Sequence, residues 1–330
     1  MLWLISIMVT VHVERVKRRY VASGCSFACI FSLLTLIGTI IVPFYIAYAS
    51  HNFWLKENTY REQPFVSFAH KTLIVVQGSK SDGSALDLAW STDANMRSVY
   101  EQYLRAPVVR SSPVDTNKDG VPDAWTLSVQ MPTQADEAVH SVQLLTWYRY
   151  TLNGRASLNM EAMTYVTHSS PLAGAELLVD GTAKLHQTEP LSVRARNQQP
   201  DFFEVEPSAP VSMYGRTVPN LISSYAQRNV SMRMEDQFHV WTSRSVVDAS
   251  SEFRDTFCVN MTLRVPSDEI LYTPEIGEVI KVAWVQYFSI AAILFILFDV
   301  LRTFVYKNGV LESVSSTDAS TFAARKMHVF

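Results

Sequence analysis

One segment of the chain contains twenty-three consecutive residues without a charged side chain, FACIFSLLTLIGTIIVPFYIAYA from Phe27 to Ala49. At about 1.5 Å of rise per residue, a helix of this length extends roughly 34 Å and can cross a hydrocarbon core of about 30 Å. Because lipid offers no hydrogen bonds to the backbone, such a run predicts a transmembrane helix. The alternative is a buried helix of a soluble protein, but those helices are rarely so long and uncharged. Pro43 predicts a kink.

The charges on either side of this segment predict its orientation. Four basic residues and one acid, Glu14, precede it, whereas a balanced mixture of acids and bases follows it. Basic residues concentrate on the cytosolic flank of a span, so we expect the amino terminus in the cytosol. The basic residues are Arg15, Lys17, Arg18 and Arg19.

A second apolar run, Val282 to Phe298, lies between Lys281 and Asp299. A helix from Ile276 to Val305 is long enough to cross and would place Asp299 and Arg302 near an interface, with no ionisable residue at mid-depth. The chain is therefore expected to be a hairpin with both termini in the cytosol. The predicted parts are a cytosolic tail (1–26), a first span (27–49), an extracellular or lumenal domain (50–276), a second span with its flanks (277–305) and a cytosolic tail (306–330).

Charge and sequons agree with this topology. The net charge is −3, and the region from Ser50 to Lys281 holds 20 basic and 27 acidic residues. This excludes a strongly basic nucleic-acid-binding face. The basic residues that precede the first span lie beside the membrane, so we expect the lipid bilayer to be their partner. Two glycosylation sequons, at Asn229 and Asn260, lie in the part predicted to be outside the cytosol.

The region between the spans has the pattern of a mainly antiparallel β domain, sandwich-like in architecture. In WTLSVQM, from Trp125 to Met131, every second residue is apolar, which predicts one buried face. Asp180-Gly181 predicts a type I′ hairpin turn. Helical patches are expected at Asn95–Leu104 and Pro219–Gln227, and a loop at Gln198–Pro210. The predicted strands are Thr72–Gln77, Leu86–Ser91, Trp125–Met131, Val142–Leu152, Ala156–Thr167, Glu176–Val179, Ala183–His186 and Thr256–Val265.

The chain has three cysteines, and Cys258 is the only one between the spans, so an internal disulfide of that domain is excluded. Cys25 and Cys29 lie on one helical face at the cytosolic edge of the first span. They are interpreted as packing residues, with palmitoylation of Cys25 as the alternative.

The segment DTNKDGVPD has oxygen-bearing residues at alternating positions and a glycine at the bend, a pattern typical of calcium loops. Its twelfth position is Thr126 in place of a glutamate, which does not fit an EF-hand. Two interpretations stay open, namely a structural Ca²⁺ site and a polar hairpin turn without metal. The candidate ligands are Asp115, Asn117, Asp119, the Val121 carbonyl and Asp123.

The sequence contains no nucleophile elbow, no His-Glu-x-x-His motif and no phosphate-binding glycine loop. Its eight histidines have no pair at metal-ligand spacing. We therefore expect no enzyme activity and no cofactor.

Several segments resemble the transmembrane protein 231 family. They are SHNFWLKENTYREQPFVSFAHKTLIVV from Ser50, DTNKDGVPD from Asp115, SSYAQRNVS from Ser223, KVAWVQYFSI from Lys281 and FVYKNGV from Phe304. The resemblance covers most of the chain from Val13 to about Val310. It implies a two-span component of the Meckel-syndrome (B9) complex at the ciliary transition zone, acting with tectonic proteins, B9-domain proteins and other transition-zone membrane proteins. Such a complex limits diffusion between the ciliary and plasma membranes and supports cilium assembly and signalling.

The residues that carry the resemblance are the candidate interface residues, with membrane anchoring and packing as the alternative role for them. They are Phe53, Trp54, Leu55, Tyr60, Gln63, Pro64, Trp284 and Gln286. Competing functions are a two-span ion-channel or transporter accessory subunit, a membrane-anchored hydrolase and a chaperone-like partner of a transporter.

Overall fold

The computed structural model describes residues 18–23, 26–50, 53–193, 197–198, 218–244 and 255–317. The chain forms two compact units, one from Lys56 to Glu275 and one from the segments on either side of it. The residues before position 18, Cys25 and positions 199–210 of the predicted loop lie outside the described residues.

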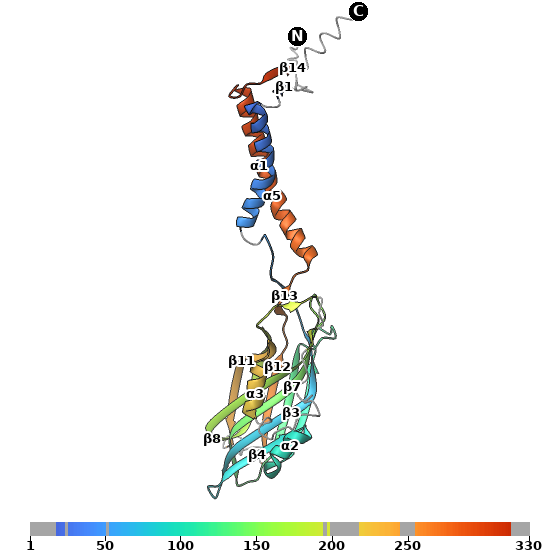
Figure 1. Cartoon of the computed structure of the whole chain (residues 1–330). Coiled ribbons are helices and arrows are strands. Elements are labelled where there is room, and N and C mark those ends of the chain that lie inside the picture. The colour runs from blue at the N-terminus through green and yellow to red at the C-terminus, as the bar shows by residue number, and fades with distance from the viewer. Residues whose placement is uncertain are drawn as a thin grey trace, which may run out of the picture. The chain divides into compact units, whose positions relative to one another are not determined.

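The first unit contains the two apolar helices, which run antiparallel (Figure 1). Helix α1 (Phe27–Ala49) has the predicted bounds, with the Ser26 side chain accepting a hydrogen bond from the Cys29 amide at its start. Helix α5 (Ile276–Lys307) extends two residues beyond the predicted end. Both are long and apolar enough to cross a membrane, and in α5 no residue of the most apolar window is buried. The two predicted spans are confirmed as helices.

Two tyrosines of α5 bond to backbone carbonyls of α1. The Tyr287 hydroxyl donates to the Ile40 carbonyl at 3.4 Å, three residues before Pro43. Pro43 has no amide hydrogen, so the Thr39 carbonyl four residues before it loses its helical donor. The Tyr287 bond is made to the next carbonyl, that of Ile40, and joins the two helices beside this turn. At the other end of the pair, the Tyr306 hydroxyl donates to the Ala28 carbonyl at 2.8 Å.

The segments that flank the helices at this second end form a two-stranded antiparallel ribbon that the sequence did not predict. Strand β1 (Arg18–Val21) pairs with β14 (Val314–Thr317), with Arg18 opposite Thr317. Tyr20 stacks on Tyr306 with ring centroids 5.7 Å apart, which ties the ribbon to α5.

The second unit is a β domain whose main sheet has nine strands, seven of them in the order β4-β3-β7-β8-β12-β6-β5. Neighbouring strands are antiparallel, except that β12 and the short β10 run parallel to β8. Each predicted strand overlaps one of its strands, although Ala156–Thr167 begins two residues early and Thr256–Val265 ends one residue late. The segments predicted at Ala156–Thr167, Glu176–Val179 and Ala183–His186 all belong to the single strand β8. The strands are β3 (Phe65–Lys80), β4 (Ala85–Ser91), β5 (Val108–Val114), β6 (Ala124–Pro132), β7 (Glu137–Leu152), β8 (Leu158–Gln187), β10 (Asn197–Gln198), β11 (Val230–Ser243) and β12 (Thr256–Arg264).

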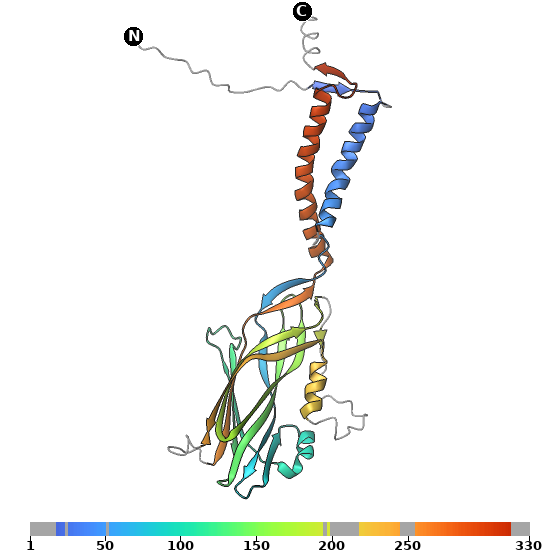
Figure 2. The same ribbon diagram turned by 90° about the vertical axis from the view of Figure 1, so that its left-hand side faces the viewer.

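The sheet curls around its main core, giving a sandwich-like domain (Figure 2). Leu127, Val129 and Met131 of β6 point into this core as the alternating pattern predicted, with Trp125 packed against it. The Trp125 indole N–H donates to the Val66 carbonyl of β3 at 2.8 Å. Strands β7, β8 and β12 lie between β3 and β6 in the sheet, so this bond crosses the core and does not follow the sheet. This bond closes the two halves of the sheet over the core.

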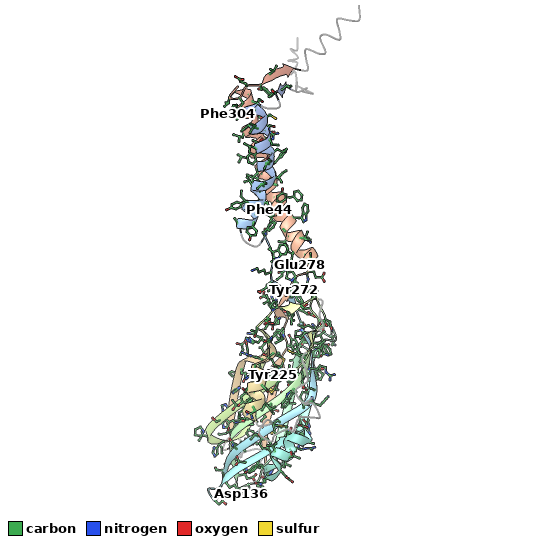
Figure 3. The ribbon with its side chains drawn as sticks, in the orientation of Figure 1. Phe44, Asp136, Tyr225, Tyr272, Glu278 and Phe304 are labelled. Carbon is green, nitrogen blue, oxygen red and sulfur yellow. The ribbon has the colours of Figure 1, made fainter. Side chains whose placement is uncertain are left out.

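Helices α2 (Ala94–Val99) and α3 (Val218–Ala226) contribute to a second, smaller core on the opposite face of β3, β7 and β8. A short 3₁₀ helix, η1 (Glu101–Tyr103), follows α2. Tyr225 fixes α3, since its hydroxyl donates to the Met232 carbonyl at 2.7 Å and accepts from the Met163 amide at 3.1 Å (Figure 3).

The hairpin predicted at Asp180-Gly181 is wrong, because β8 runs straight through it for thirty residues. Asp180 pairs with Thr262 of β12 on one side and Phe238 of β11 on the other. The Arg264 guanidinium binds both Asp180 carboxylate oxygens at 2.8 and 2.7 Å. Gly181 is needed here for close packing, since a Cβ there would lie 2.6 Å from the Met234 methyl group. Two neighbouring strands thus override the local turn propensity.

The first and last strands of the β domain pair with each other in a separate three-stranded sheet. Strand β2 (Asn58–Glu62) lies antiparallel to β13 (Asp268–Thr273), and the short β9 (Leu191–Ser192) is parallel to β13. The chain therefore enters and leaves the domain through adjacent strands.

Closure of the sheet by Trp125 can be tested by substitution. Trp125→Phe keeps an aromatic ring but leaves the Val66 carbonyl without its donor, which costs about 1 kcal/mol of the free energy of unfolding. Trp90→Phe is the control, because Trp90 also packs against the core and no indole bond is observed for it among the described residues. Denaturant titration of the full-length chain, followed by circular dichroism, should show the larger loss for Trp125→Phe. Equal losses would contradict closure through this bond.

Candidate functional site

Three of the candidate interface residues lie inside the β domain. The Tyr60 hydroxyl donates to the Glu62 carboxylate at 2.9 Å and accepts from the Ala156 amide at 3.2 Å. Burial raises the pKa of Tyr60 to about 12. The Gln63 side chain donates to Asp123 at 3.1 Å and to the Val265 carbonyl at 3.2 Å, and Pro64 is buried. Tyr60 and Gln63 are half-buried, and the bonds of both support the domain internally. The interface role of these three residues stays a prediction.

The other five belong to the helix unit. Trp54 and Trp284 are 65% and 54% exposed. Trp284 stacks on Phe288 with centroids 5.0 Å apart, and Phe53 packs edge-on against Phe44 at 5.5 Å. Exposed indoles near the ends of apolar helices favour the headgroup layer. Leu55 and Gln286 are half-buried.

In the acidic loop between β5 and β6, side-chain oxygens accept hydrogen bonds from backbone amides of the same loop. Asp115 accepts from the Lys118 and Gly120 amides at 2.6 and 3.0 Å, one with each carboxylate oxygen. Asp119 accepts from the Val121 amide at 2.7 Å, and Asn117 from the Asp119 amide at 3.0 Å. Gly120 and Lys118 have positive φ angles of 86° and 60°, which form the bend.

Asp123 connects this loop to the rest of the domain. It accepts from the Thr116 amide at 2.8 Å as well as from Gln63. The Thr116 amide, followed by Gln63, holds the pKa of the Asp123 carboxyl below its ordinary value. Its own amide and carbonyl bond to Val114 and Val265 at 2.8 and 2.7 Å. The loop is therefore a complete hydrogen-bonded turn.

The structural Ca²⁺ site and the polar turn without metal both stay open as interpretations of this loop. Calcium binds six to eight oxygens that converge on one point, and in this structure the loop oxygens accept hydrogen bonds from separate amides. In the part of the chain that the structure describes, no group of three or more His, Cys, Asp or Glu residues is placed to hold a metal.

The two sequons differ in environment. Asn229 is exposed in the turn between α3 and β11, where its carbonyl accepts from the Thr188 amide at 2.8 Å. Asn260 lies within β12, half-buried, and its side-chain amide donates to Glu176 at 2.7 Å. Asn229 is therefore the more accessible acceptor.

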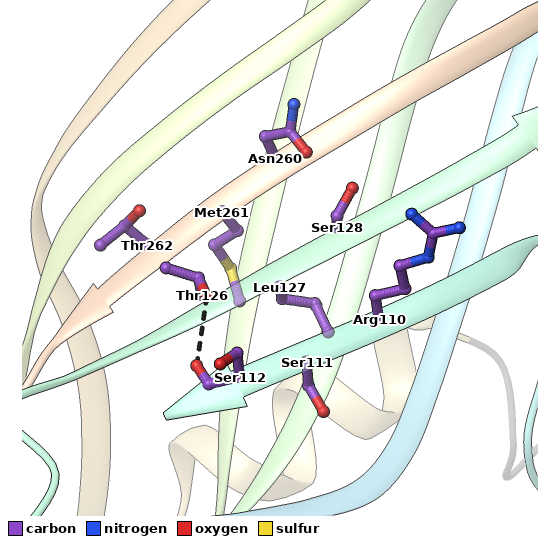
Figure 4. Close-up of a pocket in the computed structure, with 9 residues that line it drawn as sticks. All are labelled: Arg110, Ser111, Ser112, Thr126, Leu127, Ser128, Asn260, Met261 and Thr262. Carbon is purple, nitrogen blue, oxygen red and sulfur yellow. Dashed lines mark hydrogen bonds between the residues drawn. The ribbon is translucent and has the colours of Figure 1, made fainter. Parts of the chain in front are cut away.

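Asn260 borders a shallow groove of about 320 Å³ on β5, β6 and β12 (Figure 4). Serine and threonine hydroxyls line much of it, and the Thr126 hydroxyl donates to the Ser112 carbonyl at 3.1 Å. Arg110 lines it as well, and the groove holds no carboxylate, so it offers hydrogen bonds but no acid–base pair.

One pair of histidines that the sequence did not predict is brought together by strands β8 and β11. The rings of His168 and His239 lie 5.7 Å apart, and Trp241 covers His168 at 4.9 Å. Burial, followed by the neighbouring His168, lowers the pKa of His239. The pair is separated by seventy-one positions in the sequence, so only the strand register could reveal it.

The outer face of the same two strands carries an apolar patch made of Leu178, Phe238 and Val240, which are 43%, 63% and 39% exposed. Val240 lies directly opposite Leu178, and Phe238 is opposite Asp180. Exposed apolar side chains that adjoin one another are typical of contact surfaces, whereas scattered ones are not.

Helix α5 stays paired with α1 beyond the end of its apolar run at Phe298. Arg302 reaches Thr35 at 3.3 Å, two turns inside α1. The Tyr306 hydroxyl bonds to the Ala28 carbonyl, so the pairing continues to the start of α1. The position of Asp299 and Arg302 near an interface stays a prediction.

Comparison with known proteins identifies the family. A family model described as transmembrane protein 231 matches residues 7–315. The chain belongs to the transmembrane protein 231 family. Transmembrane protein 231 of Homo sapiens is 34% identical over 303 residues, covering 92% of this chain and 93% of the human protein. The Xenopus tropicalis protein is 33% identical over 309 residues, covering 93% and 96% of the two chains. The membrane-spanning character of α1 and α5 agrees with this family.

Among solved structures, a cryo-EM structure of a proton-activated chloride channel aligns with 83% of this chain and 98% of that chain. At 8% identity and a TM-score of 0.21, the likeness supports neither a shared fold nor a shared activity.

The calcium interpretation can be tested by unfolding the chain with and without the ion. A site with a Kd a hundredfold below the added calcium would stabilise the domain by about 2.7 kcal/mol. Since the loop oxygens are bonded to backbone amides, we expect the unfolding midpoint to be the same in millimolar calcium and in a chelator. A higher midpoint in calcium that Asp115→Asn abolishes would restore the calcium site.

The sequons predict a specific modification pattern. We expect Asn229→Gln to remove most of the glycosidase-sensitive mobility, because Asn229 is exposed in a turn. Asn260→Gln should change it little, because Asn260 lies within a strand and is bonded to Glu176. Loss of the shift in Asn260→Gln alone would contradict this order.

Proposed function

We propose that this protein is a structural membrane subunit of the Meckel-syndrome (B9) complex at the ciliary transition zone, where it contributes to the barrier between ciliary and plasma membranes. The observation that carries the proposal is membership of the transmembrane protein 231 family over more than nine-tenths of the chain. Its neighbours would be tectonic proteins, B9-domain proteins and other membrane proteins of that zone. Cilium assembly and signalling depend on the barrier that these proteins form.

The architecture suits a subunit that acts by contact. Two helices hold the chain in the membrane, with both termini in the cytosol and the β domain outside it. The patch of Leu178, Phe238 and Val240 is the surface of the β domain that would meet a neighbouring subunit. Burying three such side chains contributes several kcal/mol before the costs of association. This role requires neither catalysis nor a cofactor.

In this proposal, five of the residues that carry the family resemblance stabilise the protein and do not contact a partner themselves. Tyr60, Gln63 and Pro64 shape the base of the β domain, and Trp54 and Trp284 anchor the helices at the headgroup layer. A single alanine at either tryptophan removes one anchor and leaves the apolar span intact.

The proposal is tested by expressing the tagged full-length chain in ciliated cells. We expect it to lie at the ciliary base and to co-purify with tectonic and B9-domain proteins. Combined substitution of Leu178, Phe238 and Val240 by serine should reduce that co-purification by about tenfold or more while membrane insertion persists. Trp54→Ala serves as the control and should retain the partners.

Uniform distribution over the plasma membrane, with no transition-zone protein recovered, would overturn the ciliary assignment. Recovery of the partners by the serine variant would overturn the role of the patch while leaving the assignment in place.

A further inference from the structure

Asp299 lies in the part of α5 that is paired with α1. Tyr306 bonds to Ala28 and so marks the level at which α1 begins. Asp299 precedes Tyr306 by seven residues, about 10 Å along the helix. The adjacent Phe298 packs against Gly38, the twelfth of the twenty-three residues of α1. The neighbours of Asp299 on α5 thus meet α1 at Thr35 and Gly38, in the middle turns of a helix whose length matches the hydrocarbon core.

The surface around Asp299 is apolar. Asp299 is exposed, and Phe295 and Ile296, one turn before it on the same face, are 63% and 65% exposed. In the part of the chain that the structure describes, no hydrogen bond or ion pair to the Asp299 side chain is found. A carboxylate thus projects from a lipid-facing surface.

Asp299 cannot relieve this position by reaching the headgroups. Its side chain is short, and side chains on a helix tilt toward the amino terminus, which for α5 points away from the nearer end of the span. Ionisable residues in such places pair with another polar group and mark functional contacts.

Arg302, one turn further on, is the nearest basic residue, but it is engaged elsewhere. Its guanidinium turns toward α1, where one terminal nitrogen contacts the Thr35 hydroxyl at 3.3 Å. The side chain is half-buried, and its Nε has no hydrogen-bond partner among the described residues. The Arg302 charge is therefore not displayed on the surface that carries Asp299. A second copy of the chain would meet Asp299 with another carboxylate and not with an arginine.

We propose that Asp299 binds a lysine or arginine on a transmembrane helix of another protein, and that this helix packs on the α5 face formed by Phe295, Ile296 and Asp299. Pairing of the two charges removes the need to desolvate either alone, so the contact is selective for a helix with a basic residue at the same depth. The proposal depends on α5 spanning a membrane and not on the ciliary assignment.

The test uses purified full-length chain reconstituted in phosphatidylcholine vesicles, with a donor fluorophore on its carboxyl-terminal tail. The probes are leucine–alanine host helices with an acceptor fluorophore, carrying a lysine, an asparagine or a leucine about two turns from one end. We expect energy transfer to show the lysine helix associating about tenfold more tightly than the leucine helix. Asp299→Leu should abolish this difference, and Asp299→Asn should reduce it.

Ser289→Leu is the matched control. Ser289 is also exposed on α5, but its hydroxyl already donates to the Val285 carbonyl at 2.6 Å. Its substitution should leave the preference for lysine unchanged.

Three outcomes would overturn the proposal. Equal association of the lysine and leucine helices would show that Asp299 does not select a partner. Equal association of the asparagine and lysine helices would show that the positive charge is not needed. Energy transfer between two labelled copies of the chain that depends on Asp299 would assign this face to a homodimer. A chain that fails to reach the ciliary base but prefers the lysine helix would contradict only the proposed function.

Discussion

The structure depends on keeping the outgoing and returning segments of the chain paired. Three antiparallel contacts do this in sequence order: β1 with β14, α1 with α5, and β2 with β13. Each joins segments more than two hundred residues apart, so each must offset a large loop-closure entropy. None is stable alone, since an isolated two-stranded ribbon is marginal in water. Lipid confinement of the helices and the packed β domain between them supply the rest.

This constraint explains how the β domain is built. Its ends are fixed side by side, so its nine-stranded sheet must begin and finish at the same place. Strand β8 achieves this with thirty continuous residues, pairing first with β7 and then with β11 and β12. A turn at Asp180 would divide the sheet at the point where its two halves join. Arg264 on β12 fixes Asp180 there instead.

The parts of this fold that could be predicted from sequence are those set by local composition. Length and the absence of charge determine α1, and alternating side chains determine β6. What could not be predicted depends on partners distant in the chain. Gln63 looks like a surface residue until Asp123 and Val265 are placed beside it. The acidic loop has calcium-like spacing, yet its oxygens bond to amides that only the folded turn brings near. The pairing of Tyr306 with Ala28 continues beyond the apolar run of α5, which hydropathy does not report.

The proposed contact surfaces of the two units differ in the kind of side chain that would drive association. In water, an apolar group is the one that gains by being covered, and the β domain displays Leu178, Phe238 and Val240 on a polar background. In lipid, covering an apolar group gains little, and a polar group supplies the driving force. Within the helix pair, Tyr287 bonds to the Ile40 carbonyl and one Arg302 nitrogen bonds to Thr35, whereas the Arg302 Nε has no hydrogen-bond partner among the described residues. Asp299 lies exposed on the apolar surface of that same pair, which is why we infer that its partner comes from another protein.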